Sequence, residues 1–317
     1  MTASIPTLAE IDAARSRLAG VAIRTPLIRL PERGGANEIW LKLESLQPVG
    51  SFKLRGAGNC VLSAPRGDVA RGIYTASSGN MAQGVAWMAR ELGVPAKVFV
   101  PDHAPEAKIS AIRALGAEVA RVSYDEWWAI LMQRGHPGER GFFVHPVSDP
   151  AVIAGNGTVG LEIAEDLPDV DTVIVPFGGG GLACGIAAAL RELRPAARVL
   201  ACEVEGAAPL AAALQAGEPT TIEYHRSFVD GIGSTSVLPA MWPLVRSLIS
   251  ASIVVPIAEV EAALRLLVNK VHIIAEGASA TALAAALRSE QTGQKIVCVL
   301  SGSGIAFTEV ARIMQAK

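Results

Sequence analysis

Charged and aromatic residues are both scarce in this sequence of 317 residues, at 18% and 5% respectively. Soluble domains contain about 25% charged residues, so an unusually large share of these side chains is suited to burial. The net charge is −2, with both signs mixed along the chain, which excludes a basic field for nucleic acid or anionic lipid. We therefore expect a small-molecule partner, and neither nucleic acid nor a membrane.

Cysteine is rare as well, and the four cysteines show no CxxC spacing: they are Cys60, Cys184, Cys202 and Cys298. Scattered cysteines of this kind are typical of a reduced, intracellular protein. A signal peptide has a basic and then an apolar segment, whereas Met1–Ala14 contains Glu10 and Asp12. These features predict a cytoplasmic location.

Long apolar runs are also missing. The longest uncharged stretch, Thr172 to Leu190, approaches the ~20 residues of a membrane span. However, Pro176 and the glycines from Gly178 to Gly181 interrupt it. A strand, a loop and a helix therefore fit this stretch better than a membrane helix.

Aliphatic residues and glycine are abundant instead, and short β-type segments alternate with helical ones along most of the chain. This alternation indicates parallel sheets joined by right-handed crossovers, and the length indicates two domains. Thr7 and Glu10 have the spacing of a capping box, which begins a first helix. The expected strands are 39–44, 73–76, 96–100, 117–122, 142–145, 172–176, 198–203 and 295–300. The expected helices are 7–18, 81–92, 105–115, 127–133, 182–193, one near 159–166 and a final one after Gly304.

A run of four glycines, Gly178 to Gly181, follows an apolar strand and precedes a helix of small residues. Consecutive glycines let backbone N–H groups approach an anion closely, and the helix start adds positive potential. A phosphate is the natural occupant, and a merely tight turn is the alternative. The G-x-G-x-x-A pattern ending at Ala183, with Glu203 ending the next strand, also fits a dinucleotide site.

Lysine is much rarer than arginine, with seven residues against 21. Lys53 follows a turn, with Ser51 as the expected N-cap and Phe52 beside it. An amine at a helix start near an apolar ring loses part of its proton affinity, as a Schiff-base lysine requires. Taken alone, the position fits a surface lysine equally well. For the other six we expect ordinary solvated charges: Lys42, Lys97, Lys108, Lys270, Lys295 and Lys317.

A third loop, Thr75-Ala-Ser-Ser-Gly-Asn80, again joins a strand to a helix. Ser77, Ser78 and Asn80 offer hydroxyls, an amide and free helix-start N–H groups, which suit a carboxylate. A plain helix cap is the alternative for this loop.

Together these loops resemble the pyridoxal-phosphate enzymes of the tryptophan-synthase-β fold type (fold type II), specifically the branch of serine/threonine ammonia-lyases and serine racemase. Ser51–Gly56 is similar to the cofactor-lysine motif, Ser77–Asn80 to the substrate and cofactor loop, and Gly178–Gly181 to the phosphate cup. Residues 154–158, 204–205, 230–231 and 299–302 fall in the family's order too. The resemblance spans residues 7 to 317 and implies an α/β fold with two open, mostly parallel sheets flanked by helices.

By this resemblance, Lys53 holds pyridoxal 5'-phosphate until the substrate amine displaces it, and the freed Lys53 amine then removes the Cα proton. Phe52 packs on the cofactor ring, and Asn80 bonds its phenolic oxygen. Ser77 and Ser78, with the backbone that follows, hold the substrate carboxylate. The phosphate is bound by the backbone of Gly178, Gly179, Gly180, Gly181 and Leu182.

Ser301 matches the family's partner of the pyridine nitrogen. A hydroxyl stabilises a protonated ring less than a carboxylate does, so a carbanion at Cα expels a β-hydroxyl promptly. The resemblance therefore implies loss of water from a β-hydroxy amino acid such as L-threonine or L-serine, giving a 2-oxo acid and ammonia. Racemisation is the alternative, with Ser78 as the second acid/base; others are β-replacement and a lyase for 3-hydroxyaspartate or phenylserine.

Two residues depart from the family pattern. Met81 stands where the family usually has His, so we expect altered substrate contacts at Met81. Glu205 matches a glutamate that binds a divalent cation in some members, but Ala211 occupies the apparent Asp position. Because a hard cation prefers several carboxylates, we expect no metal, with Glu205 as a weak candidate only. We also expect no regulatory domain after the last helix.

Two hypotheses from other classes stay open: a NAD-binding oxidoreductase, and a non-catalytic protein that binds an amino acid as a sensor. For the fold, we expect a large cofactor-binding domain formed by residues 1–48 and 147–317 and a small inserted domain formed by residues 49–146. We also expect a homodimer.

Overall fold

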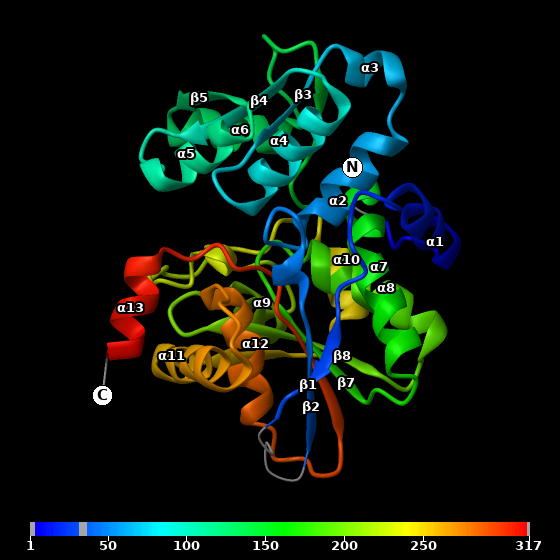
Figure 1. The fold of residues 1–317 in the computed structure, drawn as a ribbon, viewed down its shortest axis with the longest axis vertical. Helices are drawn as coiled ribbons and strands as arrows, with labels where there is room; N and C mark the ends of the chain where they lie inside the picture. Colours follow the sequence, from blue (N-terminus) through cyan, green and yellow to red (C-terminus); the bar gives the residue numbers. More distant parts are fainter. Residues whose placement is uncertain (1–3, 32–36, 316–317) are drawn as a thin grey trace.

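Two separate β-sheets organise the chain (Figure 1). The computed structural model describes residues 4–31 and 37–315, so Lys317 lies outside the described residues. The six-stranded sheet has the order β1-β2-β10-β7-β8-β9 and the four-stranded sheet the order β5-β4-β3-β6. The strands of the first are β1 Leu27–Arg29, β2 Glu38–Lys42, β7 Thr172–Pro176, β8 Arg198–Val204, β9 Ser252–Val255 and β10 Lys295–Val299. Those of the second are β3 Ile73–Ala76, β4 Ala96–Pro101, β5 Glu118–Val122 and β6 Phe142–Phe143.

Both sheets are parallel except for the edge pair β1–β2, which is antiparallel. This confirms the predicted fold class. All strands of the four-stranded sheet come from within residues 73–143, and all strands of the other sheet lie outside that range. The exact division into a large domain and an inserted domain 49–146 stays a prediction.

Helices cover the sheets on both faces, as Figure 1 shows for the six-stranded sheet. In β7, Val173 and Val175 pack with α7, α8 and α10, whereas Ile174 points to the opposite face and packs with α11 and α12. This two-sided burial explains the continuous apolar runs in the sequence. The helices are α1 Leu8–Arg17, α2 Lys53–Ser63, α3 Arg66–Ala70, α4 Asn80–Leu92, α5 Glu106–Ala114, α6 Tyr124–Gln133, α7 Pro150–Asp166, α8 Gly181–Leu193, α9 Pro209–Ala216, α10 Trp242–Leu248, α11 Ile257–Leu266, α12 Gly277–Leu287 and α13 Phe307–Gln315.

The helix expected near 159–166 begins much earlier, at Pro150. The N-terminal half of this helix was not predicted because it contains several glycines, and glycine normally disfavours a helix. Here they allow close helix packing: a Cβ on Gly155 would lie 2.4 Å from the carbonyl oxygen of Arg55 in α2. A Cβ on Gly157 would lie 3.0 Å from the carbonyl oxygen of Gly185 in α8. The tertiary contacts of α7 therefore override its local sequence preference.

Some of the other expected helices and strands are confirmed, and others differ in the structure. The capping box of Thr7 and Glu10 is present at the start of α1. The strand expected over 142–145 is limited to β6, and α9, α10, β9, α11 and α12 had not been assigned from the sequence. Within the described ranges, no helix combines the length and the apolar character needed to cross a bilayer.

Lys42 is not the solvated charge we expected, because its side chain is fully buried. Its Nζ donates to Oε2 of Glu162 at 2.5 Å and to the carbonyl oxygen of Thr25 at 2.7 Å. Arg55 of α2 joins the same cluster by donating to Glu162 at 2.7 Å and to Glu44 at 2.7 and 2.8 Å. Two buried cations therefore balance two buried carboxylates where α2 meets β2 and α7.

Candidate active site

Backbone hydrogen bonds join the turn before α2 to the loop that follows β10. The N–H of Phe52 donates to the carbonyl oxygen of Ser301 at 3.0 Å, and Ser303 N–H donates to the carbonyl oxygen of Gly50 at 2.9 Å. Ser51 and Gly302 form an isolated β-bridge between these hydrogen bonds. Two loops from opposite ends of the chain are thereby held side by side. Ser51 is not the N-cap we expected, because Phe52 occupies that position and the Ser51 hydroxyl is buried without a partner among the described residues.

Lys53 is the first residue of α2, and its amine is desolvated. Its Nζ lies 5.1 Å from the centre of the Phe52 ring and donates to the carbonyl oxygen of Pro146 at 3.0 Å. Burial lowers the pKa of Lys53 to about 8, although the charge of Glu276 acts in the opposite direction. The expected loss of proton affinity is therefore present, and burial is its cause. A lysine with this pKa is a nucleophilic amine at moderately alkaline pH.

The glycine run forms the turn between β7 and α8. Gly180 is the N-cap residue of α8 in a left-handed conformation (φ +88°), and no side chain caps the helix start. Its first-turn N–H groups therefore remain open to an external acceptor. The turn has no room for side chains, since a Cβ on Gly179 would lie 2.5 Å from both methyl carbons of Val147. This backbone cradle fits a phosphate group.

Asn156 of α7 adds a polar side chain to this cradle. It is 1% exposed, its Oδ1 has no hydrogen-bond partner among the described residues, and its Nδ2 lies 3.5 Å from a Cβ built on Gly181. Oδ1 lies 2.8 Å from a Cβ built on Gly56 in α2, so Nδ2 is the part of the amide that lies beside the open N–H groups of α8 and can donate to a ligand there. Sequence reasoning placed Asn156 in a family-like segment but gave it no role.

Asn80 is the first residue of α4 and points toward the six-stranded sheet. Its Nδ2 donates to Oε2 of Glu276 at 3.0 Å and to Oε1 at 3.2 Å. The N-cap position is Gly79, whose N–H donates to the Ser77 hydroxyl at 3.3 Å. No side chain caps α4, so the plain-cap alternative for Ser77, Ser78 and Asn80 is wrong. The start of α4 instead leaves N–H groups open for an anion.

Met81 does not line the site as we expected. Its side chain is 1% exposed and packs in the cluster that contains Leu54 and Val85. Met81 packs in this core, whereas the Asn80 amide contacts Glu276. Its thioether is therefore a packing group, and only the backbone of Met81 is available at the helix start.

Ser301 directly follows Leu300 at the end of β10 and is 2% exposed. Its hydroxyl lies 3.5 Å from that of Ser279 in α12. Ser279 in turn donates to the carbonyl oxygen of Gly302 at 2.7 Å and accepts from its N–H at 2.9 Å. The Ser301 hydroxyl is thus buried and neutral, and it lies next to the turn that carries Lys53. Among the described residues, no carboxylate is hydrogen-bonded to it.

Two further residues near Lys53 were missed by sequence reasoning. Glu276 contacts Asn80 as described above, and no local pattern marks it. His145 is 5% exposed, and its Nδ1 accepts from the N–H groups of Val147 and Ser148. Burial, with the charges of Arg134 and Lys53, lowers the pKa of His145 to about 3. This imidazole is neutral, and its hydrogen bonds hold the backbone that follows β6 near Lys53.

The acidic residues considered for other ligands have structural partners. Glu203 is fully buried and accepts from the N–H groups of Leu210 and Ala211 at the start of α9, so it does not reach a ribose. Glu205 is exposed and accepts from the N–H of Ile257 at 2.9 Å. No group of three or more potential metal-ligating acids, histidines or cysteines exists in the described ranges.

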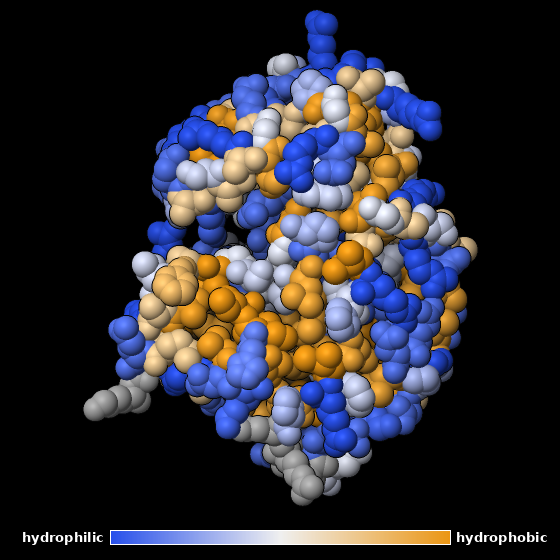
Figure 2. Space-filling view, in the orientation of Figure 1, coloured by the Kyte–Doolittle hydropathy of each residue, from blue (hydrophilic) through white to orange (hydrophobic). Residues whose placement is uncertain are grey.

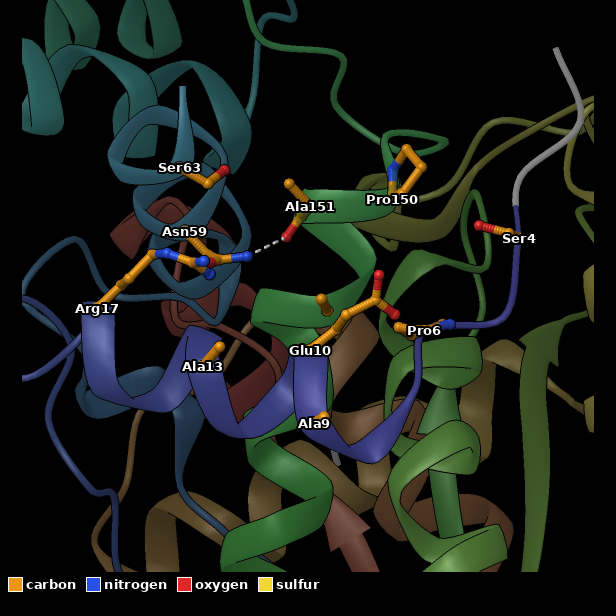
Figure 3. A pocket seen from close by; sticks show the side chains of 11 residues that line it. Ser4, Pro6, Ala9, Glu10, Ala13, Arg17, Asn59, Ser63, Pro150 and Ala151 are labelled. Carbon is orange, nitrogen blue, oxygen red and sulfur yellow. Dashed lines mark hydrogen bonds between the residues drawn. The ribbon is translucent and has the colours of Figure 1, made fainter. Parts of the chain in front are cut away.

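A surface pocket of about 440 Å³ between α1, α2 and α7 lies apart from these groups (Figure 3). Its charged and amide side chains are already paired: Arg17 donates to Asn59, which donates to the carbonyl oxygen of Ala151 at 2.7 Å, and Glu10 accepts from the N–H of Thr7 at the cap of α1. Lys53 does not line this pocket. The candidate catalytic groups therefore lie outside this pocket.

A desolvated lysine amine, an open glycine cradle and a buried serine hydroxyl meet at the carboxyl ends of parallel strands. This combination defines an enzyme in which lysine and a phosphate site hold an aldehyde cofactor. The family model described as pyridoxal-phosphate dependent enzyme matches residues 18–302. The chain belongs to this family, and its cofactor is pyridoxal phosphate.

Similar proteins indicate which branch of this family the chain resembles. The chain is 41% identical over 282 residues to the L-threonine ammonia-lyase of Geobacter sulfurreducens, covering 87% of this chain and 70% of that protein. It superimposes on maize serine racemase with a TM-score of 0.91 at 30% identity, covering 98% and 97% of the two chains. For threonine deaminase isoform 2 of Solanum lycopersicum the TM-score is 0.89 at 30% identity, covering 99% and 91%.

These comparisons establish a fold-type II enzyme of the lyase branch. The hypothesis of a NAD-binding oxidoreductase is therefore wrong. The structure also argues against a dinucleotide site. The carboxylate of Glu203 is fully buried and accepts a hydrogen bond at the start of α9, so it does not reach the glycine loop.

Proposed function

We propose that this enzyme removes water from a small β-hydroxy amino acid such as L-threonine or L-serine and releases a 2-oxo acid and ammonia. In this reaction the Cα–H and Cβ–OH bonds break, a Cα=Cβ bond forms, and the resulting enamine takes up water to release ammonia. The observation that carries the proposal is the position of the Lys53 amine, desolvated beside Phe52 and joined through the backbone to Ser301. The lyase names of the relatives support it.

Lys53 is the proposed base. Its pKa of about 8 leaves a useful fraction of neutral amine near neutral pH, and this amine takes the Cα proton at Nζ. Bound pyridoxal phosphate supplies the sink for the electrons of that bond. The carbonyl oxygen of Pro146, 3.0 Å from Nζ, accepts a hydrogen bond from the amine and orients it.

Binding and orientation fall to the three loops. We assign the phosphate to the backbone N–H groups of Gly178, Gly179, Gly180, Gly181 and Leu182, with the Asn156 amide as an additional donor. We assign the substrate carboxylate to Ser77, Ser78 and the open N–H groups at the start of α4. Phe52 packs on the cofactor ring and Asn80 donates to its phenolic oxygen. These roles follow from the family motifs and from the open donors described above.

Ser301 determines the type of reaction in this proposal. A neutral, buried hydroxyl beside the pyridine nitrogen stabilises positive charge on the ring less than a carboxylate does. The negative charge left at Cα after proton removal is then lost with the departing β-hydroxyl and does not persist on the ring. Elimination is favoured over transamination for this reason.

Racemisation is the second candidate, because maize serine racemase has the same fold at 30% identity over nearly the whole chain. It requires a second acid/base on the opposite face of the substrate, and we assign this role to Ser78. Ser78→Ala separates the two reactions: it abolishes inversion of serine if Ser78 is that group, whereas elimination from the L-enantiomer, which uses Lys53, continues with a raised KM because Ser78 also contacts the substrate carboxylate.

The test is a substrate panel of L- and D-serine, L-threonine, 3-hydroxyaspartate and phenylserine, scored for ammonia and for inversion. The wild-type holoenzyme is expected to release ammonia from L-threonine or L-serine, and Lys53→Ala to lose both activity and the yellow colour. Lys97→Ala is the matched control, because Lys97 pairs with Glu118 and Glu139 on the surface. Ordinary activity in Lys53→Ala would overturn the proposal, and a cofactor-loaded protein inactive on the whole panel would favour the sensor hypothesis.

We also propose that the enzyme works in the cytoplasm as a homodimer. All four cysteines are free and buried, as suits a reducing compartment. Figure 2 shows hydrophobic residues gathered over the face that carries α11 and α12, and apolar patches of this kind favour self-association. Nearby, Phe307 at the start of α13, which packs on α11, is 78% exposed. Light scattering on Phe307→Asp tests the dimer, which this change should weaken.

A further inference from the structure

Glu276 immediately precedes α12, yet its side chain does not cap that helix. Instead the carboxylate turns into the space between the two sheets and is nearly enclosed, with the residue 7% exposed. It accepts from Nδ2 of Asn80 at 3.0 and 3.2 Å and from the N–H of Gly304 at 3.2 Å. Glu276 thus links the start of α4 to the loop after β10.

This contact fixes the orientation of the Asn80 amide. An ionised carboxylate only accepts hydrogen bonds, so the NH₂ side of Asn80 must face Glu276. The oxygen side is directed to Gly304, where Oδ1 lies 3.0 Å from a built Cβ. The NH₂ group carries two hydrogens, and when the two Glu276 oxygens share one of them, the other can bind an acceptor of the cofactor. Without Glu276, a flip of the amide would present an acceptor there instead.

Glu276 also acts on the Lys53 amine through its charge. Burial lowers the pKa of Lys53, and the negative charge of Glu276 partly offsets this effect. Burial raises the pKa of Glu276 itself, as does the charge of Asp230, whereas the bonds from Asn80 and Gly304 and the charge of Lys108 lower it. Lys108 donates to Asp230 at 2.7 Å, so these two charges largely offset each other beside Glu276.

We propose that Glu276 is a positioning residue, which holds the NH₂ group of Asn80 toward the cofactor's phenolic oxygen and keeps a negative charge beside the Lys53 amine. The proposal rests on the roles assigned to Lys53 and Asn80 in the proposed function. Glu276 itself transfers no proton in it. It acts through Lys53 of α2 and Asn80 of α4.

The principal test is Glu276→Gln, which keeps the shape and can still present one oxygen to Asn80 but removes the charge. The readout is the rate at which apoenzyme takes up pyridoxal phosphate as a function of pH, because the neutral Lys53 amine must react. Loss of the nearby negative charge should move the half-maximal pH down by about 1 unit. Glu276→Asp keeps the charge and should restore the wild-type midpoint at least in part.

The matched control is Glu259→Gln, which removes a surface carboxylate paired with Arg288 and should leave the midpoint unchanged. A double-mutant cycle tests the link to Asn80. If Glu276 acts on cofactor affinity through the Asn80 amide, Glu276→Gln should weaken the affinity severalfold in the wild type but hardly at all in Asn80→Ala. Should Glu276→Gln not fold, as judged by circular dichroism, the comparison of Glu276→Asp with Asn80→Ala decides by the same two readouts.

An unchanged midpoint together with additive effects on cofactor affinity would overturn the role of Glu276. Cofactor uptake requires no turnover, so this result is independent of the substrate panel. A wild-type protein that takes up cofactor but releases no ammonia refutes the proposed lyase and leaves the role of Glu276 intact.

Discussion

Phe52 and Ser301 are joined by a hydrogen bond of 3.0 Å from the N–H of Phe52 to the carbonyl oxygen of Ser301. Through it, the residue before Lys53, the proposed catalytic lysine, is fixed to the proposed partner of the pyridine nitrogen. Because the bond uses the backbone of Ser301, its side chain can change without releasing the Lys53 turn. The chemistry of Ser301 is therefore separable from its structural role.

Ser301→Ala should retain the fold and cofactor binding but have a lower kcat. The hydroxyl is buried beside Ser279, and one hydrogen bond contributes about 0.5–1.5 kcal/mol, so we expect kcat to fall up to about tenfold. The melting temperature should stay within a few degrees of the wild type. Ser303→Ala is the control, since its hydroxyl donates to the backbone carbonyl oxygens of Ser45 and Gly50 and not to Ser279 or Ser301. Wild-type kcat in Ser301→Ala would show that its hydroxyl is dispensable.

The pH dependence of cofactor uptake should report the Lys53 amine directly. The pKa of Lys53 is lowered to about 8, so the neutral amine grows as pH rises toward 8 and saturates above it. Apoenzyme mixed with pyridoxal phosphate should therefore react fastest above pH 8, with a midpoint near 8. Stopped-flow absorbance measures the rate. A midpoint above 10, as for an exposed lysine, would contradict the desolvated site.

Arg55 should be essential for stability because it balances two buried carboxylates. Its guanidinium holds the pKa of Glu44 below the usual value, although burial alone would raise that pKa. Removing one partner of a buried pair costs about 3–5 kcal/mol, so Arg55→Met should lower the free energy of unfolding by that amount in urea titrations. Arg71→Met, which breaks an exposed pair with Asp68, should cost under about 1 kcal/mol. Similar losses in the two variants would refute the role of the buried cluster.

Gly179→Ala should damage the phosphate cradle. The added methyl group would lie 2.5 Å from the side chain of Val147, so the loop must shift, and we expect cofactor affinity to fall at least about tenfold through lost backbone hydrogen bonds. Gly67→Ala is the control, because a Cβ at Gly67 meets nothing within 4 Å. Val147→Ala combined with Gly179→Ala should recover part of the affinity. Equilibrium dialysis measures each constant, and equal affinities for both glycine variants would contradict the prediction.

Local signals allowed much of the fold to be predicted from the sequence. Gly93 ends α4 in a left-handed conformation, Thr7 and Glu10 begin α1, and the apolar run of β7 indicates a strand buried on both faces. The start of α7 was not predictable in this way, because Gly155 and Gly157 disfavour a helix until α2 and α8 pack against them. Local preference and tertiary packing disagree there, and packing prevails.

The sequence by itself determined the chemical inventory: a rare lysine at a helix start, a glycine run after an apolar strand, and a serine after the last strand. These are local patterns, and each is set by backbone constraints within a few residues. Only the tertiary structure decided which charges are buried and what they face. Lys42 became a buried ion rather than a solvated one, Met81 became core, and Glu276 came to lie against Asn80. Burial and pairing depend on segments distant in sequence, so no local pattern encodes them.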